Sequence, residues 1–251
     1  MQTVLITGCS SGFGLSTARY FLERNWKVIA TMRTPDASVF APSEHLRVLA
    51  LDVTDPNSIQ QAIEAAGPID VLVNNAGIGF LGALEGSSMQ AIRDIFETNT
   101  FGTMAVTQAE LPQFRQRKTG VVINVTSTVT VKSLPLLSVY TASKAAVNAF
   151  TESLALELEP FNIRVRLVLP GRAPDTDFGK NAQARMQGTI PEAYNDLAQQ
   201  VFAEWSQSTL VTEAQDVAEA VWRAANDPTS PMRMAAGADA IVWMREQTSH
   251  A

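Results

Sequence analysis

The chain has 251 residues, of which 46% are hydrophobic and 18% charged, and this length and composition allow a soluble globular protein with a substantial core. The net charge of −6 argues against nucleic acid or an anionic membrane as the main partner, because both repel an acidic surface. One cysteine excludes an intramolecular disulfide. Two histidines far apart in the sequence disfavour a His-based metal site and a Ser-His-Asp triad.

The N-terminus enters an apolar run at once and lacks the basic segment that opens a signal peptide. No apolar run approaches the roughly 18 residues that a membrane span needs. We therefore expect a cytoplasmic protein with no membrane partner.

Short apolar runs alternate with helical patterns along the chain. Strands are expected at residues 4–7, 27–31, 46–51, 70–74, 121–125 and 164–169, and helices from about residue 15, at 56–66, 89–117, 140–159 and 217–225. A last strand is expected around residues 240–243. This alternation predicts an α/β fold with a doubly wound parallel sheet and helices on both faces. No linker interrupts it, so we expect one domain over residues 1–251 with an insertion at about residues 172–212.

A glycine-rich turn separates the first strand from the first helix, with Gly8, Gly12 and Gly14 spaced Gly-x-x-x-Gly-x-Gly. Glycines let a ligand approach the backbone closely, and a helix N-terminus offers free N–H groups and a positive dipole end to a pyrophosphate. The alternative is an ordinary tight turn. The position at the first strand–helix junction favours a dinucleotide site. Cys9, inside the turn, is interpreted as a small filler residue.

Arg33 follows the second strand, where dinucleotide folds place the residue that contacts the adenine ribose. An acidic residue there binds a free 2′-hydroxyl, whereas an arginine pairs with a 2′-phosphate. Asp36 follows shortly but does not stand at the strand end. The sequence therefore predicts NADP(H) in preference to NAD(H), with NAD(H) possible.

Tyr140 and Lys144 lie about one helical turn apart, so their side chains share a face of the expected helix. An ammonium near a phenol lowers the pKa of the phenol, which makes a usable acid or base near neutral pH. Such a pair also arises by chance on solvated helices.

Seven motifs in order make the chain resemble the classical short-chain dehydrogenase/reductase family. They are Thr7-Gly8-x-x-x-Gly12-x-Gly14, Asp52-Val53, Asn74-Asn75-Ala76-Gly77, Asn99, Ser127, Tyr140-x-x-x-Lys144 and Pro170-Gly171. The resemblance spans essentially the whole chain. The Val4–Gly12 opening and the Ala30–Arg33 turn are also similar to those of NADP-using hydroxysteroid dehydrogenases and carbonyl reductases of the family. The family implies a seven-stranded sheet and a homodimer or homotetramer assembled through long helices.

The resemblance also implies roles for individual residues. Ser127 binds the substrate oxygen, Tyr140 transfers its proton, Lys144 holds the nicotinamide ribose and lowers the Tyr140 pKa, and Asn99 holds a water that relays protons. The implied cofactor contacts are Gly8, Ser10, Ser11, Gly12, Phe13, Gly14, Arg33, Asp52, Val53, Asn74, Ala76, Gly77, Tyr140, Lys144, Pro170 and Gly171. No metal is implied. Thr176 stands one position later than the threonine that the family carries after Pro-Gly, so it is left out.

The predicted activity is hydride transfer between NADP(H) and an alcohol/ketone pair. Apolar residues at 80–81, 134–137, 178, 186, 202 and 205 favour an apolar, medium or large carbonyl substrate, the alternative being a lid packed onto the core. Three other functions stay open: an NAD-dependent alcohol dehydrogenase, an epimerase or dehydratase, and a cofactor-binding sensor or scaffold without turnover.

Overall fold

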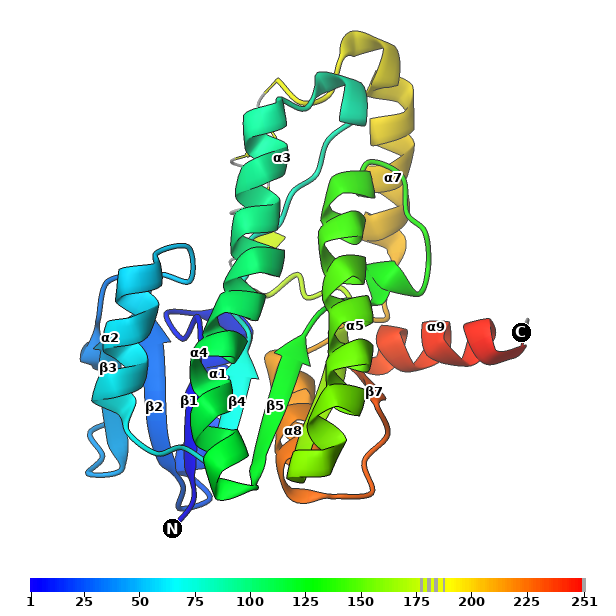
Figure 1. The fold of residues 1–251 in the computed structure, drawn as a ribbon. Helices are drawn as coiled ribbons and strands as arrows, with labels where there is room; N and C mark the ends of the chain where they lie inside the picture. Colours follow the sequence, from blue (N-terminus) through cyan, green and yellow to red (C-terminus); the bar gives the residue numbers. More distant parts are fainter. Residues whose placement is uncertain (177, 180–181, 183–184, 187, 250–251) are drawn as a thin grey trace.

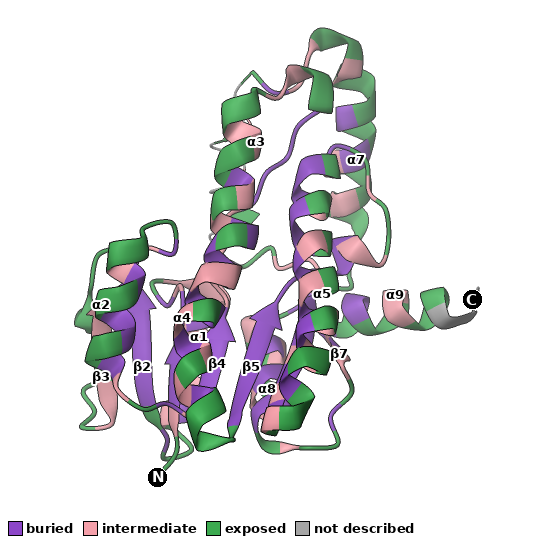
Figure 2. Cartoon of the chain, viewed as in Figure 1, coloured by how far each residue is buried: buried purple, intermediate pink, exposed green. Residues whose placement is uncertain are grey.

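Seven parallel strands form a single sheet in the order β3-β2-β1-β4-β5-β6-β7. The computed structural model describes residues 1–176, 178–179, 182, 185–186 and 188–249. The strands are β1 (Thr3–Ile6), β2 (Lys27–Met32), β3 (Leu46–Ala50), β4 (Val71–Asn74), β5 (Gly120–Val125), β6 (Ile163–Pro170) and β7 (Arg233–Ala236). The central strands read as apolar runs because helices bury both of their faces, and β4 and β5 are purple over their whole length in Figure 2.

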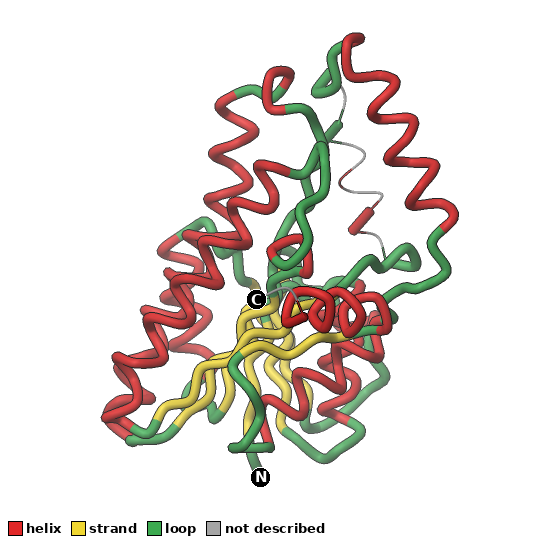
Figure 3. Tube along the Cα trace, turned by 90° about the vertical axis from the view of Figure 1, so that its right-hand side faces the viewer, coloured by secondary structure: helices red, strands yellow, loops and turns green. Residues whose placement is uncertain are grey.

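Helices cover the sheet on both sides, and the turned view of Figure 3 shows the strands lying between them. One layer contains α1 (Gly12–Leu22) and α8 (Ala214–Asn226), and the other contains α2 (Pro56–Ala66), α4 (Gly102–Arg117) and α5 (Ser138–Leu158). The predicted doubly wound α/β fold is confirmed.

A second group of elements rises beyond the carboxyl ends of the strands (Figure 1). It contains α3 (Met89–Phe96), the N-terminal half of α5 and α7 (Asn195–Gln207), which belongs to the segment between β6 and α8. Thr189 ties this segment to the chain after β4: its hydroxyl donates to the Leu81 carbonyl over 3.1 Å, and its own carbonyl accepts from the Ala83 amide over 3.0 Å.

The expected strand at residues 240–243 is wrong. The last strand is β7, and residues 240–243 belong to the helix α9 (Ala238–Ser249). Gly237 ends the strand with φ +100°, and the Asp239 carboxylate accepts the Ala240 amide at the helix start. These contacts outweigh the strand preference of Ile241, Val242 and Trp243.

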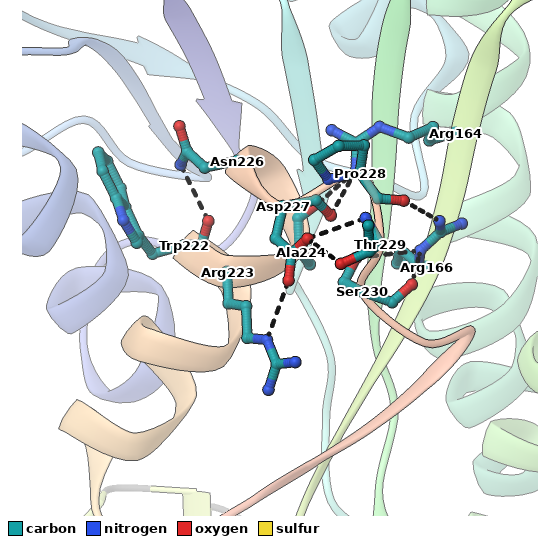
Figure 4. A network of polar contacts seen from close by, with 10 residues as sticks. All are labelled: Arg164, Arg166, Trp222, Arg223, Ala224, Asn226, Asp227, Pro228, Thr229 and Ser230. Carbon is teal, nitrogen blue, oxygen red and sulfur yellow. Dashed lines mark hydrogen bonds and ion pairs between the residues drawn. The ribbon is translucent and has the colours of Figure 1, made fainter.

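Arg164 and Arg166 tie the amino-terminal half of β6 to the end of α8 and the turn that follows it (Figure 4). Arg164 donates to the carbonyl oxygens of Ala224 and Ala225 over 3.0 and 2.6 Å. Arg166 donates to the Ser230 carbonyl over 2.9 Å. The guanidinium of Arg164 thus satisfies carbonyls that the last helical turn leaves without partners.

Within the described ranges, no helix combines the length and apolar character that crossing a membrane requires.

Candidate active site

The sheet order places a crevice between β1 and β4, where the connections after the strands diverge to opposite faces. The glycine turn lies at this point. Gly8 and Gly12 have φ angles of +75° and +55°, which favour glycine, and a side chain at Gly14 would overlap the Gly8 carbonyl. Ser11 is the N-cap of α1, and among the described residues no side-chain hydrogen bond caps that helix start. The start of α1 therefore keeps backbone N–H groups that can bind a pyrophosphate.

The other residues of the turn differ in exposure. Ser10 is exposed, and Phe13 is half-buried against the core. Cys9 is fully buried, and burial raises the pKa of its thiol to about 12. A protonated, buried thiol is inert, which agrees with its interpretation as a filler residue.

Arg33 is exposed directly after β2 and lies near Asp52, which follows β3. Hydrogen bonds from Thr54, with a smaller contribution from the Arg33 charge, keep the pKa of Asp52 below its usual value. Asp36 turns its carboxylate to Ser38 and caps a short helix there. Arg33 is thus the charged residue that stands at the end of β2. Val53 is buried against Gly102 of α4.

Asn74 directs its side chain into the core, where it is buried. Its Nδ2 donates to the Thr107 hydroxyl over 2.9 Å and to Asn124 Oδ1 over 2.8 Å. The Asn74 side chain therefore braces β4 against α4 and β5, and the backbone of Asn74 is the part left for the predicted cofactor contact.

Thr7 and Asn75 connect the glycine turn to β4, and the residue-by-residue prediction missed both. Asn75 Nδ2 donates to the carbonyls of Thr7 and Gly8 over 2.9 and 3.1 Å. The Thr7 hydroxyl accepts the amides of Asn75 and Ala76 over 3.0 and 2.9 Å. Both residues belong to the motifs that carry the family resemblance, so the motifs could have pointed to them. The apolar periodicity of the strands could not, because it gives no information on hydrogen bonds made by side chains.

Gly8 and Gly77 both have close neighbours that leave little room for a side chain. A side chain at Gly8 would lie 2.9 Å from Ala76 Cα. A side chain at Gly77 would lie 3.2 Å from Asn99 Oδ1 and 3.3 Å from Lys144 Nζ. Gly77 therefore leaves room for an amide and an ammonium to come together.

Ser127, Tyr140 and Lys144 meet beside this point. Ser127 follows β5, whereas Tyr140 and Lys144 lie on α5, and all three are buried. The Ser127 hydroxyl lies close enough to the Tyr140 phenol to interact with it. Lys144 Nζ donates to the Val125 carbonyl over 3.1 Å and lies 6.0 Å from the centre of the Tyr140 ring. Two hydroxyls and a cation thus lie close together at the carboxyl end of β5.

The pKa of Tyr140 is raised, not lowered as the sequence led us to expect. Burial disfavours the phenolate and outweighs the hydrogen bond from Ser127. Burial also lowers the pKa of Lys144 to about 8. Tyr140 in this environment holds its proton, which suits a proton donor better than a proton acceptor.

Asn99 lies in a π-helical turn, Glu97–Phe101, between α3 and α4. Its Nδ2 donates to the Ile78 carbonyl over 3.0 Å and to the Ser143 hydroxyl over 3.2 Å, and its Oδ1 accepts the Ile78 amide over 2.8 Å. Such turns are frequent at functional sites because they redirect one side chain. Here Asn99 holds the chain after β4 next to α5.

Pro170 ends β6, and Gly171 follows it on the other side of β4 and β5 from the glycine turn. Thr176 is buried, and its methyl group lies 3.7 Å from the position that a side-chain β-carbon at Gly12 would take. Thr176, which the sequence analysis left out of the cofactor contacts, therefore lies next to the glycine turn. The Phe178 ring lies 5.9 Å from the Tyr140 ring. No group of three or more His, Cys, Asp or Glu side chains that would suit a metal occurs in the part of the chain that the structure describes.

A sequence model of the short chain dehydrogenase family matches residues 2–187. The chain belongs to this family. Retinol dehydrogenase 8 of Bos taurus is 35% identical over 255 residues, covering 92% of this chain and 80% of that protein. The 3-ketodihydrosphingosine reductase of Bacteroides thetaiotaomicron is 41% identical over 174 residues, covering 68% of this chain and 63% of that protein. A closed serine dehydrogenase complexed with NADP+ is 26% identical with a TM-score of 0.81, covering 95% of each chain.

Membership of the short-chain dehydrogenase family identifies the protein as an oxidoreductase and confirms the resemblance drawn from the seven motifs. The family binds nicotinamide dinucleotides, and the glycine turn described above fits one.

Proposed function

We propose that this short-chain dehydrogenase is an NADP(H)-dependent ketone reductase or alcohol dehydrogenase. The observation that carries the proposal is the grouping of Ser127, Tyr140 and Lys144 at the edge of the glycine-lined crevice. When bound, the cofactor supplies a hydride to the carbonyl carbon. The residues of the chain then have to stabilise and protonate the oxygen on which negative charge develops.

In this proposal, the Ser127 hydroxyl donates to the substrate oxygen, and Tyr140 delivers the proton. The raised pKa of Tyr140 keeps this proton in place until charge develops on the oxygen. Lys144, with a pKa of about 8, carries its charge at neutral pH. It would bind ribose hydroxyls and stabilise the phenolate left after transfer. The assigned role of Asn99 is to hold a proton-relaying water next to Lys144.

NADP(H) is the proposed cofactor because Arg33 is exposed at the end of β2 while Asp36 is engaged with Ser38. The serine dehydrogenase with bound NADP+ supports the same choice. We assign the phosphates to the turn from Gly8 to Gly14 and the adenine to Asp52 and Val53. The backbones of Ala76, Gly77, Pro170 and Gly171 would face the nicotinamide half.

The proposed substrate is an apolar ketone or alcohol of medium or large size. Residues 172–212 would act as its lid, because α7 closes over the loops after β4 and β5 with an apolar cluster. The buried or half-buried members of that cluster are Leu81, Ala83, Leu136, Leu137, Met186, Ile190, Tyr194, Ala198, Phe202 and Trp205. The two similar curated proteins act on retinol and 3-ketodihydrosphingosine by their names, whereas the serine dehydrogenase represents the polar alternative.

A homodimer or homotetramer is proposed through the exposed face of α4 and α5. Phe101 is 52% exposed at the start of this face. A hollow of about 350 Å³ between the two helices is lined mainly by Phe101, Met104, Leu111, Phe150 and Leu154. An apolar, hollowed face of two long helices suits a second copy of the same face.

The experiment is a panel of carbonyl compounds measured by the loss of nicotinamide absorbance with NADPH and with NADH. We expect long-chain and cyclic apolar ketones and aldehydes to be reduced with NADPH in preference to NADH. Preference for serine or for small charged keto acids would refute the proposal that the substrate is apolar. The absence of turnover with every carbonyl and alcohol, while NADPH still binds, would favour the sensor or scaffold alternative.

A further inference from the structure

Asp239 is a buried carboxylate that no proposed catalytic step uses. It is 3% exposed and lies at the start of α9, far along the chain from the crevice residues. Its Oδ2 accepts the Arg172 amide over 2.6 Å. Its Oδ1 accepts the Ala240 amide over 2.9 Å and lies 2.7 Å from the Thr212 hydroxyl. The carboxylate therefore joins α9 to both ends of the segment 172–212.

Thr212 completes this connection. Its amide donates to the Arg172 carbonyl over 2.8 Å, and its hydroxyl accepts the Gly171 amide over 2.9 Å. The hydroxyl proton can go to Asp239 Oδ1 or to the Ala236 carbonyl, 2.8 Å away. Arg172 and Thr212, forty residues apart in the sequence, are thus held side by side. We name the pair of Asp239 and Thr212 the clasp.

Two glycines make room for the clasp. A side chain at Gly171 would overlap the Asp239 carboxylate, and a side chain at Gly237 would overlap the Thr212 hydroxyl. Gly237 also has a φ of +100°, which favours glycine. Gly171, assigned above to the cofactor site, therefore lies directly against the clasp.

We propose that Asp239 is a positioning residue, which, through the clasp, fixes the Gly171–Arg172 backbone against the cofactor site and holds the two ends of the 172–212 segment together. This inference rests on the proposed function, because it assigns the clasp to cofactor binding. A carboxylate that accepts several buried donors is a strong and directional anchor. Loss of one acceptor should loosen both the strand end and the base of the lid.

The test is Asp239→Asn, which keeps the shape of the side chain but replaces one carboxylate oxygen by an NH2 group. That group is a donor, and it would face a donor of the surrounding backbone or hydroxyl groups. Loss of a hydrogen bond to a charged group should raise the equilibrium constant for local opening of the backbone by about tenfold or more. We therefore expect amide hydrogen exchange in peptides containing Arg172 and Thr212 to rise about tenfold, with exchange in β1, β4 and β5 unchanged. The KM for NADPH and its Kd from fluorescence should rise about threefold or more, with a smaller effect on kcat.

Asp227→Asn is the matched control, since Asp227 also binds a threonine, Thr229, but lies at the amino-terminal end of the sheet. Its KM for NADPH should stay at the wild-type value. Thr212→Val should reproduce Asp239→Asn, and Thr212→Ser, which keeps the hydroxyl, should restore binding. This pair carries the test if Asp239→Asn does not fold.

Exchange and NADPH affinity within twofold of wild type would overturn the inference. Faster exchange with unchanged NADPH affinity would also overturn it, because the clasp would then be only structural. If the wild-type protein neither binds nor oxidises NADPH, the proposed function itself fails, and the clasp loses its assigned role with it. If the wild type turns over normally and only Asp239→Asn has no effect, the proposed function survives.

Discussion

At the scale of single residues, burial decides the chemistry of the candidate site. Tyr140 and Lys144 lie on the same face of α5, as their spacing predicts. The direction of the Tyr140 pKa shift was not predictable, because it depends on how much water the surrounding elements exclude. Likewise, the sequence places Asn74 in a motif but does not show that its side chain faces Thr107 and Asn124.

Arg33 offers the sharpest single-residue test of the cofactor. Arg33→Asp should raise the KM for NADPH by about 10- to 100-fold, because a charge-assisted pair with the 2′-phosphate is lost and replaced by repulsion. The KM for NADH should change little. Steady-state kinetics with both cofactors measures the ratio, and Lys27→Asp, at the opposite end of β2, is the control. Equal effects on NADPH and NADH would contradict the 2′-phosphate assignment.

At the scale of elements, the apolar runs predicted six of the seven strands within one or two residues, because parallel strands are buried on both faces. The last strand and α9 were not predictable in this way. Gly237 and Asp239 set that boundary through contacts with Thr212 and Arg172, which lie far away in the sequence. Thr176 was excluded on spacing, yet the chain after β6 brings it over Gly12.

Arg164 gives the element-scale prediction. Arg164→Met keeps the apolar stem but removes the donors to the carbonyls of Ala224, Ala225 and Asp227 at the end of α8. We expect the free energy of unfolding to fall by about 1–3 kcal/mol, the range for hydrogen bonds from a charged donor. Urea denaturation measures this, with Arg115→Met on the exposed side of α4 as control. A midpoint equal to that of the control would contradict the capping role.

At the scale of the whole molecule, one fully buried acid makes the stability of the fold depend on pH. Glu110 of α4 is 0% exposed, and among the described residues neither of its carboxyl oxygens has a hydrogen-bond partner. Burial raises its pKa from 4.5 to about 8, although the Arg117 charge acts in the opposite direction. The folded protein therefore holds this proton at pH values where the unfolded chain has released it.

Stability should consequently fall as the pH rises from about 4.5 to 8, by up to roughly 1.4 kcal/mol per pH unit from this group. Glu110→Gln should remove this slope and be more stable than wild type at pH 8. Glu157→Gln, on the exposed side of α5, should keep the slope. Urea denaturation at several pH values gives the comparison, and identical slopes for all three proteins would show that Glu110 is ionised in the fold.

The central claim is that Tyr140 donates the proton in an NADPH-dependent reduction, and the measurement closest to it compares wild type with Tyr140→Phe. With a reducible ketone from the panel, kcat from the loss of nicotinamide absorbance should fall at least about 100-fold, the range for general acid catalysis. NADPH affinity, measured by fluorescence, should stay within about threefold, because only one hydroxyl is removed. Tyr20→Phe on α1 removes the same group away from the crevice and should keep full activity. Near-normal turnover by Tyr140→Phe would contradict the account.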